Sequence, residues 1–382
     1  MDIFEIYLLI YTLSAFLYLW YRYTFLLLTK ENTSGNYSGK VSVVVPFYNE
    51  KPELLVRTIR SINDCYGEKE IILIDDGSTS IDGYNAAVKL SKEIPIQVFR
   101  YEKNKGKKYA QEVGFKKANC SILMSCDSDS LLKKDAISKL IKPFSDSHIG
   151  AVTGRVEVLN VKSNWLTKLQ TGMYWEGFGV DKVHQDRLGN VVCCSGPISA
   201  YRKEIVDKVL DEYLNVKFFG QKYLHGEDRT LTTLILKEGY GVKYVQDAIA
   251  YTEVPEKFGQ FIKQQIRWQK SWLVESFKLY SYRKKIYKKT LFDVLVVNLF
   301  FPFFSLFSRV FLFISIIMTP SSIPFVASFL VLILVLYSLF TLFHKPKYFL
   351  YAIAWGLFHL FIFYWIMYYS LFTLMNNSWG TR

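Results

Sequence analysis

The run VSVVVPFY at 41–48, followed by EIILIDD at 70–76, decides the fold of this chain. Both are short, almost continuously apolar and rich in β-branched residues, a pattern typical of strands buried on both faces. Two more such runs follow, IQVFRY (96–101) and SILMSCDSD (121–129), and helix-like segments such as KKYAQEVGFKKA (107–118) separate the runs. The apolar run NVVCC (190–194) predicts a further strand. Strands that alternate with helices form a largely parallel sheet. The sequence therefore predicts an α/β fold with helices on both faces of a mostly parallel sheet.

Long apolar segments flank this region, at 3–28 and 291–375. The first is long enough to cross a bilayer, and no small-residue cleavage site follows it, so we expect a membrane anchor over residues 1–30. Residues 291–318 and 323–343 are each long enough to cross as well. We therefore expect two further transmembrane helices over 291–343.

Basic residues outnumber acidic ones by 47 to 34, which gives a formal net charge of +13. Such an excess is typical of nucleic-acid binding, or of membrane proteins that keep Lys and Arg on the cytosolic side. Here the basic residues cluster beside the apolar segments, at 283–289 and 345–347, which favours the membrane interpretation. We expect a multi-pass protein of the plasma membrane with a cytosolic domain at 31–258, and no nucleic-acid partner.

The last part of the chain, residues 344–382, allows two interpretations. Two crossings return the chain to the cytosol at HKPK (344–347), where positive charge belongs. Residues 348–375, which are rich in Trp and Tyr, either cross once more or lie in the plane of the interface as an aromatic amphipathic helix. In the second case the terminal residues stay cytosolic.

Pairs of acidic residues lie at the ends of two of the predicted strands, Asp75–Asp76 and Asp127–Asp129. Ligands of parallel sheets bind at the carboxyl ends of strands, so the first pair could accept hydrogen bonds from a ribose or a base. The second pair, with one residue between its members, would face one side and hold a divalent ion together with substrate phosphates. Each pair is equally compatible with a turn or a helix cap.

Charged residues also gather at two predicted helix starts. A basic glycine turn leads into the helix predicted at 107–118, where backbone N–H groups and ammonium groups suit a diphosphate, although a solvated basic helix start gives the same pattern. Its residues are Lys105, Gly106, Lys107 and Lys108. Glu227 and Asp228 precede another helix, where one carboxylate could act as a general base, although acids are favoured at any helix N-terminus.

The segment QFIKQQIRWQKSW at 260–272 is the most specific element. Gln264, Arg267 and Trp268 lie close together on a helix, where Arg can clamp a diphosphate and Trp can stack on a sugar. An amphipathic helix at the membrane interface, over 259–290, explains the same residues, and both interpretations can hold together.

Taken together, these motifs resemble the family-2 glycosyltransferases of the hyaluronan synthase and chitin synthase group. The matching segments, in the family's order and spacing over about 41–382, are VVVPFYNE, IDDGS, NKGKKYAQ, CDSDS, CCSGPISAYRKE, GEDRTLT, QQIRW and WGTR. The resemblance implies a GT-A-like fold and a membrane-bound, inverting, processive enzyme that polymerises UDP-sugars into a β-linked polysaccharide. It also implies Mg²⁺ or Mn²⁺ as cofactor, with the growing polysaccharide and the lipid bilayer as partners. Whether the enzyme works as a homo-oligomer stays open.

The resemblance also implies residue roles. Asp228, with Glu227, corresponds to the catalytic base, Asp129 to the metal ligand, and Trp379, Gly380 and Thr381 to a segment that closes over the nucleotide. The nucleotide-sugar site corresponds to Pro46, Tyr48, Glu50, Asp75, Asp76, Lys107, Asp127, Asp129, Gln264, Arg267 and Arg382, and the acceptor site to Cys194, Ser195, Gly196 and Trp268.

The product stays open between two polymers. ISAYRKE and WGTR are similar to hyaluronan synthases, which use UDP-GlcNAc and UDP-GlcA. The single N-terminal span and GEDRTLT are similar to chitin and chitin-oligosaccharide synthases, which use UDP-GlcNAc only.

Two rival functions match fewer of these motifs. A non-processive transferase acting on a lipid phosphate generally lacks the QxxRW motif, which this chain carries at 264–268. A non-catalytic membrane export protein would not need Asp129 and Asp228. The motifs therefore favour a polymerising transferase over both.

Overall fold

The computed structural model describes residues 3–28, 35–223, 225–344 and 346–376. Its centre is an eight-stranded sheet of order β3-β2-β1-β4-β7-β6-β10-β5 within the described residues. The strands are β1 (Val41–Phe47), β2 (Lys69–Asp75), β3 (Ile96–Arg100), β4 (Ile122–Ser125), β5 (Ser130–Leu132), β6 (Ile149–Val158), β7 (Ser199–Arg202) and β10 (Gly241–Thr252).

The sheet is mixed but mostly parallel, as the sequence predicted. Strands β3, β2, β1 and β4 run parallel, and so do β6 and β10, while β7 lies antiparallel between β4 and β6. Phe47 pairs with Asp75, so β1 and β2 end together. The residues that follow these strands are therefore brought to one edge of the sheet.

Side chains on the two faces of the sheet enter two separate cores. Val43 and Val45 of β1 pack on one face and Val44 packs on the other, as the alternation of a strand requires. Ile59 covers the first face and Phe115 the second, each from a helix. The helices on the first face are α2 (Pro52–Asn63), α3 (Asp82–Leu90) and α5 (Ala136–Leu140), and those on the second are α4 (Lys107–Lys117), α8 (Lys203–Leu214) and α9 (Glu227–Lys237).

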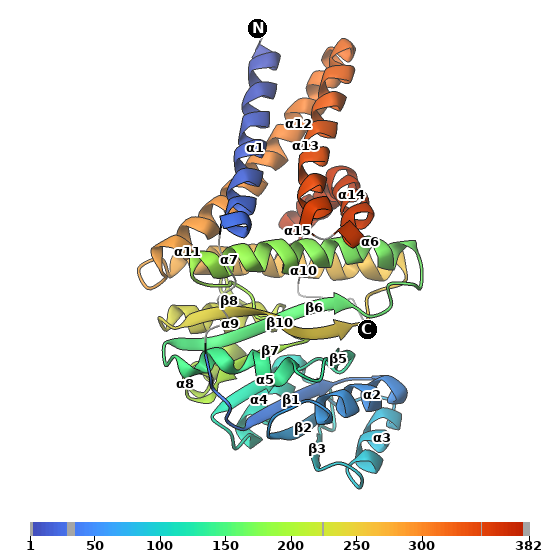
Figure 1. Ribbon diagram of the computed structural model, residues 1–382, viewed down its shortest axis with the longest axis vertical. Helices are drawn as coiled ribbons and strands as arrows, with labels where there is room; N and C mark the ends of the chain where they lie inside the picture. The colour runs from blue at the N-terminus through green and yellow to red at the C-terminus, as the bar shows by residue number, and fades with distance from the viewer. Residues whose placement is uncertain (1–2, 29–34, 224, 345, 377–382) are drawn as a thin grey trace.

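Two long helices lie across the sheet domain on the side opposite its first strands (Figure 1). One is α10 (Phe258–Ser281). The other runs without interruption through α6 (Trp165–Tyr174), the π-helical turns η2 (Trp175–Asp181) and α7 (Lys182–Leu188). These helices separate the sheet domain from the helices that extend beyond it.

Beyond them, α1 (Ile3–Leu28), α12 (Phe301–Met318) and α13 (Ile323–His344) extend away from the sheet (Figure 1). A continuous helix of 31 residues, Lys288–Met318, comprises α11, η3 and α12. Among the described residues it is the helix that is long and apolar enough to cross a membrane. Its position agrees with the predicted span at 291–318. Helices also occupy 3–28 and 323–343, and their crossing of a membrane remains a prediction.

The segment at 348–375 forms α14 (Phe349–Phe358), the turn η6 (His359–Phe363) and α15 (Tyr364–Phe372). Helix α14 contacts α6, and α15 contacts α10. Trp355 and Phe358 share an apolar cluster with Leu166 of α6 and Phe261 of α10. The position of this segment relative to the membrane stays a prediction. The predicted closing segment WGTR (379–382), with Arg382, lies outside the described residues.

One predicted element is wrong. The run NVVCC (190–194), interpreted as a strand from its apolar residues, is an irregular segment. Side-chain oxygens bind two of its backbone N–H groups, because Val192 donates to Gln185 and Cys194 donates to Thr232. The N–H of Val191 donates to the backbone carbonyl of Val242 in β10, but with its neighbours bound by side chains this contact does not extend into a ladder.

Candidate active site

A large cavity of about 1240 Å³ opens at the carboxyl ends of β1 and β4 and continues between the long helices. Most of the predicted site residues line it, although they come from separate parts of the chain. These are Pro46, Tyr48, Asp76, Lys107, Asp127, Asp129, Ser195, Gly196, Glu227, Asp228, Gln264, Arg267 and Trp268. Glu50, Asp75 and Cys194 are not among the lining residues.

The two acids at the end of β2, Asp75 and Asp76, have different surroundings. Asp75 is fully buried, accepts hydrogen bonds from the backbone and hydroxyl of Ser78, and pairs with Arg100 at 3.2 Å. These contacts hold the turn after β2 together. Asp76 faces the cavity instead.

Asp76 organises the loop before α4. Its carboxylate accepts hydrogen bonds from the backbone N–H groups of Lys105 and Gly106, at 3.0 and 2.9 Å, and from the Asn104 amide at 3.0 Å. Burial raises the pKa of Asp76 above its usual value, although these backbone bonds oppose the shift. The basic loop at the start of α4 is therefore hydrogen-bonded to Asp76, the residue predicted to bind the nucleotide.

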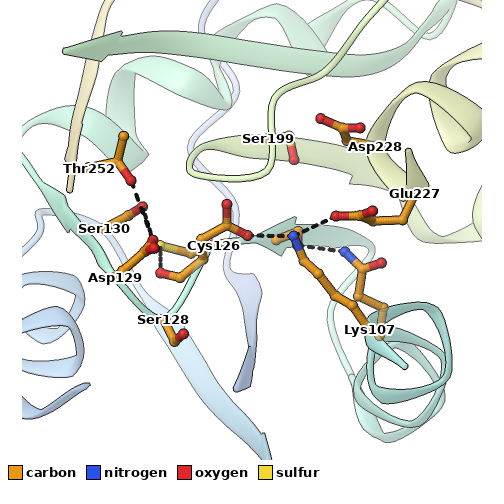
Figure 2. A network of polar contacts seen from close by, with 12 residues as sticks. Lys107, Cys126, Ser128, Asp129, Ser130, Ser199, Glu227, Asp228 and Thr252 are labelled. Atoms are coloured by element: carbon orange, nitrogen blue, oxygen red, sulfur yellow. Dashed lines mark hydrogen bonds and ion pairs between the residues drawn. The ribbon is translucent and has the colours of Figure 1, made fainter. Parts of the chain in front are cut away.

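Lys107, the first residue of α4, joins two acidic segments of the site. Its ammonium lies 2.6 Å from Asp127 Oδ1 and 2.7 Å from Glu227 Oε1 (Figure 2). Burial alone would lower the pKa of Lys107, but the two carboxylates raise it overall, so it is cationic. The same contact, against burial, lowers the pKa of Glu227 to about 2. Lys107 thus holds the end of β4 against the start of α9.

The acids after β4 lie in a turn rather than on the strand, which ends at Ser125. Asp129 Oδ1 accepts bonds from Ser130 and Thr252, each at 3.3 Å (Figure 2). Between the two acids, Ser128 donates to Glu50 at 2.7 Å, so Glu50 supports this turn from outside the cavity. Both carboxylates face the cavity, as predicted, with Asp127 bound to Lys107.

The described residues include no group of three or more His, Cys, Asp or Glu side chains that could hold a metal by themselves. Asp127 and Asp129 supply carboxylate oxygens at the cavity wall. Mg²⁺ and Mn²⁺ accept one or two protein carboxylates when substrate phosphates and water complete their coordination. The residues present therefore fit a divalent ion that arrives with a diphosphate.

Asp228 follows Glu227 in the first turn of α9 and lies farther from Lys107 than Glu227 does (Figure 2). Burial and the adjacent Glu227 charge raise its pKa, with Arg229 opposing the shift. The pKa values of these two neighbouring carboxyl groups are thus shifted in opposite directions. Glu227 is stabilised as an anion, whereas Asp228 is a better proton acceptor. Such separation is typical of acid–base sites.

Helix α10 contributes Gln264, Arg267 and Trp268 to the cavity wall. Arg267 lies near enough to Glu227 to help lower the pKa of that carboxyl group. The ring of Trp268 lies 6.4 Å from that of Tyr174 in α6, so two aromatic rings line this part of the cavity. The predicted grouping of the three residues on one helix is confirmed.

The segment 193–197 lies between the acids of β4 and α9. Gly196 packs against Asp127, since a Cβ at this position would lie 2.7 Å from Asp127 Oδ2. Cys193 lines the cavity, with its Sγ 3.7 Å from Asp228 Oδ2. The sequence prediction selected the adjacent Cys194, which is fully buried outside the cavity. Two consecutive cysteines in an irregular segment give no periodic signal that could separate them.

The cavity also reaches the helices beyond the sheet domain. Tyr11 and Arg22 of α1, Arg309 of α12 and Trp355 of α14 line it. Arg22 pairs with Glu176 at 3.3 Å and with Asp181, and so connects α1 to η2. Arg22 lies near the end of the apolar segment 3–28, and no sequence pattern indicates its acidic partners.

Comparison with known proteins places this geometry in a family. The description "Glycosyl transferase family 2" matches residues 42–210. A hyaluronan synthase of Streptococcus pyogenes serotype M1 is 32% identical over 364 residues, which cover 90% of this chain and 83% of the relative. The chain therefore belongs to the family-2 glycosyltransferases, in the group of the hyaluronan and chitin synthases. Within that group it is a hyaluronan-synthase-like glycosyltransferase.

Two further comparisons agree. An N-acetylglucosaminyltransferase of Azorhizobium caulinodans is 32% identical over 263 residues, covering 68% of this chain and 66% of the relative. The structure of a mannosyltransferase from Pyrobaculum calidifontis, in complex with GDP-Man and Mn²⁺, aligns with a TM-score of 0.63 and 18% identity. It covers 92% of this chain and 96% of the other, and it confirms the GT-A-like fold.

Proposed function

We propose that this protein is a membrane-embedded, inverting and processive transferase that uses UDP-GlcNAc to build a β-linked polysaccharide. The observation that carries the proposal is the cavity in which Asp76, Asp129, Arg267 and Asp228 meet. This cavity continues along α1 and α12, so a growing chain has a path away from the reacting groups.

The donor nucleotide would bind at the end of the cavity nearest β1 and β2. Tyr48 and Asp76 follow these strands and suit the uridine, because a carboxylate can accept hydrogen bonds from a ribose or a base N–H. The diphosphate then lies between the 104–107 loop and Arg267, a bidentate donor to phosphate oxygens. Gln264 lies one helical turn before Arg267, beside the same position.

A divalent ion bound by Asp129 and the diphosphate would neutralise the charge that develops on the leaving group. The mannosyltransferase of the same fold was solved with Mn²⁺ and a nucleotide sugar, which supports an ion at this position. Asp127 is bound to Lys107, so Asp129 is the better candidate for the ligand.

The transfer is a single displacement. The acceptor hydroxyl oxygen attacks the anomeric carbon, the bond from that carbon to the diphosphate oxygen breaks, and UDP leaves with the electron pair. Asp228 takes the hydroxyl proton, and its raised pKa suits this role. Attack from the face opposite the leaving group converts an α-linked donor into a β-linked product. Trp268 and Tyr174 would orient the acceptor ring without taking part in the chemistry.

The membrane plane would then lie where the α14–α15 segment packs on α6 and α10, on the side of these helices away from the sheet (Figure 1). In this arrangement α1, α12 and α13 cross the bilayer, while the catalytic domain and the WGTR segment stay in the cytosol. Closure of that segment, including Arg382, over the nucleotide is part of the same proposal.

The test is product formation by purified protein in lipid nanodiscs or detergent. Labelled UDP-GlcNAc is supplied with and without UDP-GlcA, and the product is digested with chitinase or hyaluronidase. We expect a polymer sensitive to one of the two enzymes, together with release of UDP. Release of UDP without any polymer or oligosaccharide would refute a polymerising function, and label recovered only in lipid phosphates would support the non-processive transferase instead.

A further inference from the structure

The first turn of α9 carries the proposed base, and other helices hold the residues on both sides of that base. On one side, Glu227 pairs with Lys107 of α4. On the other side, the hydroxyl of Thr230 donates to Glu275 Oε1 of α10 at 2.9 Å. Asp228 lies between these two contacts and lines the cavity. The position of its carboxylate therefore depends on both contacts.

Glu275 is a buried carboxylate that the mechanism above does not use. It is 2% exposed, and its Oε1 atom also accepts from the ammonium of Lys278 at 3.0 Å. Its other oxygen, Oε2, has no hydrogen-bond partner among the described residues. A buried carboxylate with an unused oxygen is unfavourable for folding, and such departures from good packing are typical of functional sites. An apolar side chain would be sufficient at position 275 if packing were its only role.

Glu275 can act on the transfer only through other residues. Within the described part of the chain, neither Glu275 nor Thr230 lines the cavity, so neither contacts a bound substrate. Thr230 follows Asp228 by two residues on α9, and Glu275 follows Arg267 by about two helical turns on α10. The Thr230–Glu275 bond thus connects the helix of the proposed base to the helix of the proposed diphosphate donor.

The transfer is sensitive to the separation of these two helices. The base and the diphosphate donor act on opposite sides of the anomeric carbon, and a shift of about 1 Å in such an arrangement can lower the rate ~100-fold. Ser271, halfway between Arg267 and Glu275, packs against Gly226 at the start of α9. Packing alone keeps α9 and α10 apart, whereas the bond to Thr230 holds them together.

We propose that Glu275 is a positioning residue for the transfer, because its bond to Thr230 fixes the distance between Asp228 on α9 and Arg267 on α10. The proposal rests on the proposed function, with Asp228 as the base and Arg267 at the diphosphate.

The charge of Glu275 has a second, separate effect. It is the counter-charge of Lys278, and although burial lowers the pKa of Lys108, the charge of Glu275 opposes that shift. Glu275→Gln removes this charge but keeps an oxygen that accepts from Thr230. Thr230→Val removes the bond but keeps the charge and nearly the same side-chain volume. The two variants therefore separate a positioning role from a structural one.

The experiment measures transfer from UDP-GlcNAc, binding of UDP by calorimetry and the thermal unfolding midpoint of the full-length protein. We expect Thr230→Val to lower kcat at least ~10-fold, with KM for UDP-GlcNAc and Kd for UDP changed less than about 2-fold, because the nucleotide site stays in place. Thr230→Ser, which keeps the hydroxyl, should retain kcat. Glu275→Gln should keep kcat within about 3-fold, although loss of the counter-charge lowers its unfolding midpoint.

Thr233→Val is the matched control. Thr233 lies one turn after Thr230 on α9 and is equally buried, and its hydroxyl has no hydrogen-bond partner among the described residues. Its replacement should leave kcat unchanged within about 2-fold. A further comparison introduces Thr230→Val into Asp228→Asn, where the additional loss should be less than about 2-fold if Thr230 acts through the base.

Four outcomes would overturn the proposal. These are an unchanged kcat in Thr230→Val, equal losses in Thr230→Val and Thr233→Val, and a loss in Glu275→Gln as large as that in Thr230→Val, which would make the charge responsible. The fourth is an undiminished effect of Thr230→Val in the Asp228→Asn background. Each of them leaves polymer synthesis by the wild type intact. Absence of any transfer from UDP-GlcNAc in the wild type would instead overturn the proposed function itself.

Discussion

The ammonium of Lys107 lies 2.7 Å from Glu227 Oε1, a contact that joins the first residue of α4 to the first residue of α9, 120 positions later in the chain. Two helix starts that are far apart in the sequence are thereby attached to each other. The contact makes the placement of the acidic pair at 227–228 dependent on a basic residue beside the nucleotide loop.

Substitution of Lys107 by Met should reverse the pH dependence of stability. In the wild type the pKa of Glu227 is about 2, below its usual value of 4.5. The stabilisation of the folded state by ionised Glu227 is therefore complete above pH 4.5 and is lost as the pH falls towards 2. Without Lys107, burial would raise that pKa, and the variant should gain stability on acidification. Loss of the pair should cost about 3–5 kcal/mol at neutral pH. Thermal unfolding between pH 2.5 and 7 measures both effects, and parallel curves would contradict the expectation.

Asp228→Asn should lower transfer at least ~100-fold, because an amide cannot accept the hydroxyl proton. Binding of UDP-GlcNAc, measured by calorimetry, should be retained. Since the pKa of Asp228 is raised and the base must be ionised, wild-type kcat/KM should rise with pH through a midpoint above 3.8. Near-normal polymer synthesis by Asp228→Asn would remove it from the role of base.

Gly196→Ala should lower activity at least ~10-fold, because its Cβ would lie 2.7 Å from Asp127 Oδ2 and displace that carboxylate. Gly259→Ala is the matched control, since a Cβ there meets no atom within 4 Å. The assay is UDP release at saturating donor, with the unfolding midpoint measured in parallel. Equal activities of the two variants would show that the close packing of Gly196 does not matter.

Chelation with EDTA should stop transfer, and Mn²⁺ or Mg²⁺ should restore it. Asp129→Ala should respond to neither ion, because the remaining carboxylate, Asp127, is occupied by Lys107. Activity is followed across a titration of each ion. Full activity of the wild type in chelator would exclude the metal role of Asp129.

Membrane topology can be tested with cysteine labelling, because the five native cysteines are buried. A reagent that cannot cross membranes should label Ser321→Cys, in the exposed turn between α12 and α13, from outside intact cells. It should miss Lys284→Cys, which lies between α10 and α11, until the cells are permeabilised. The reverse pattern would place the catalytic domain outside the cell.

The sheet and most of the site were predictable from the sequence, because buried strands and strand-end acids have local signatures. The start of α4 was predicted at residue 107, and the helix indeed begins there. The different positions of Asp75 and Asp76 were not predictable. Which of two adjacent acids faces the cavity depends on the partner Arg100, a residue from another strand.

The burial of Lys182, the first residue of α7 and part of the cavity wall, was not predictable for a similar reason. A lysine near the start of a polar helical stretch is usually solvated, and nothing in FGVDKVHQDRL separates this one from its neighbours. Its burial results from packing against the segment that includes Cys193, which the sequence indicated as a strand. Because the segment 190–194 was predicted to be a strand, its contact with Lys182 could not be foreseen.

The start of α9 has a consequence for how this protein can vary during evolution. Gly226 has a φ of 67°, and a Cβ at this position would overlap the hydroxyl of Ser271 on α10. Gly226 precedes the proposed base by two residues, and Ser271 follows Arg267 by four. Position 226 can therefore gain a side chain only if α9 moves away from Ser271 and carries the base with it. In an alignment of related chains, small residues at 271 should accompany glycine at 226, and the two positions should change together.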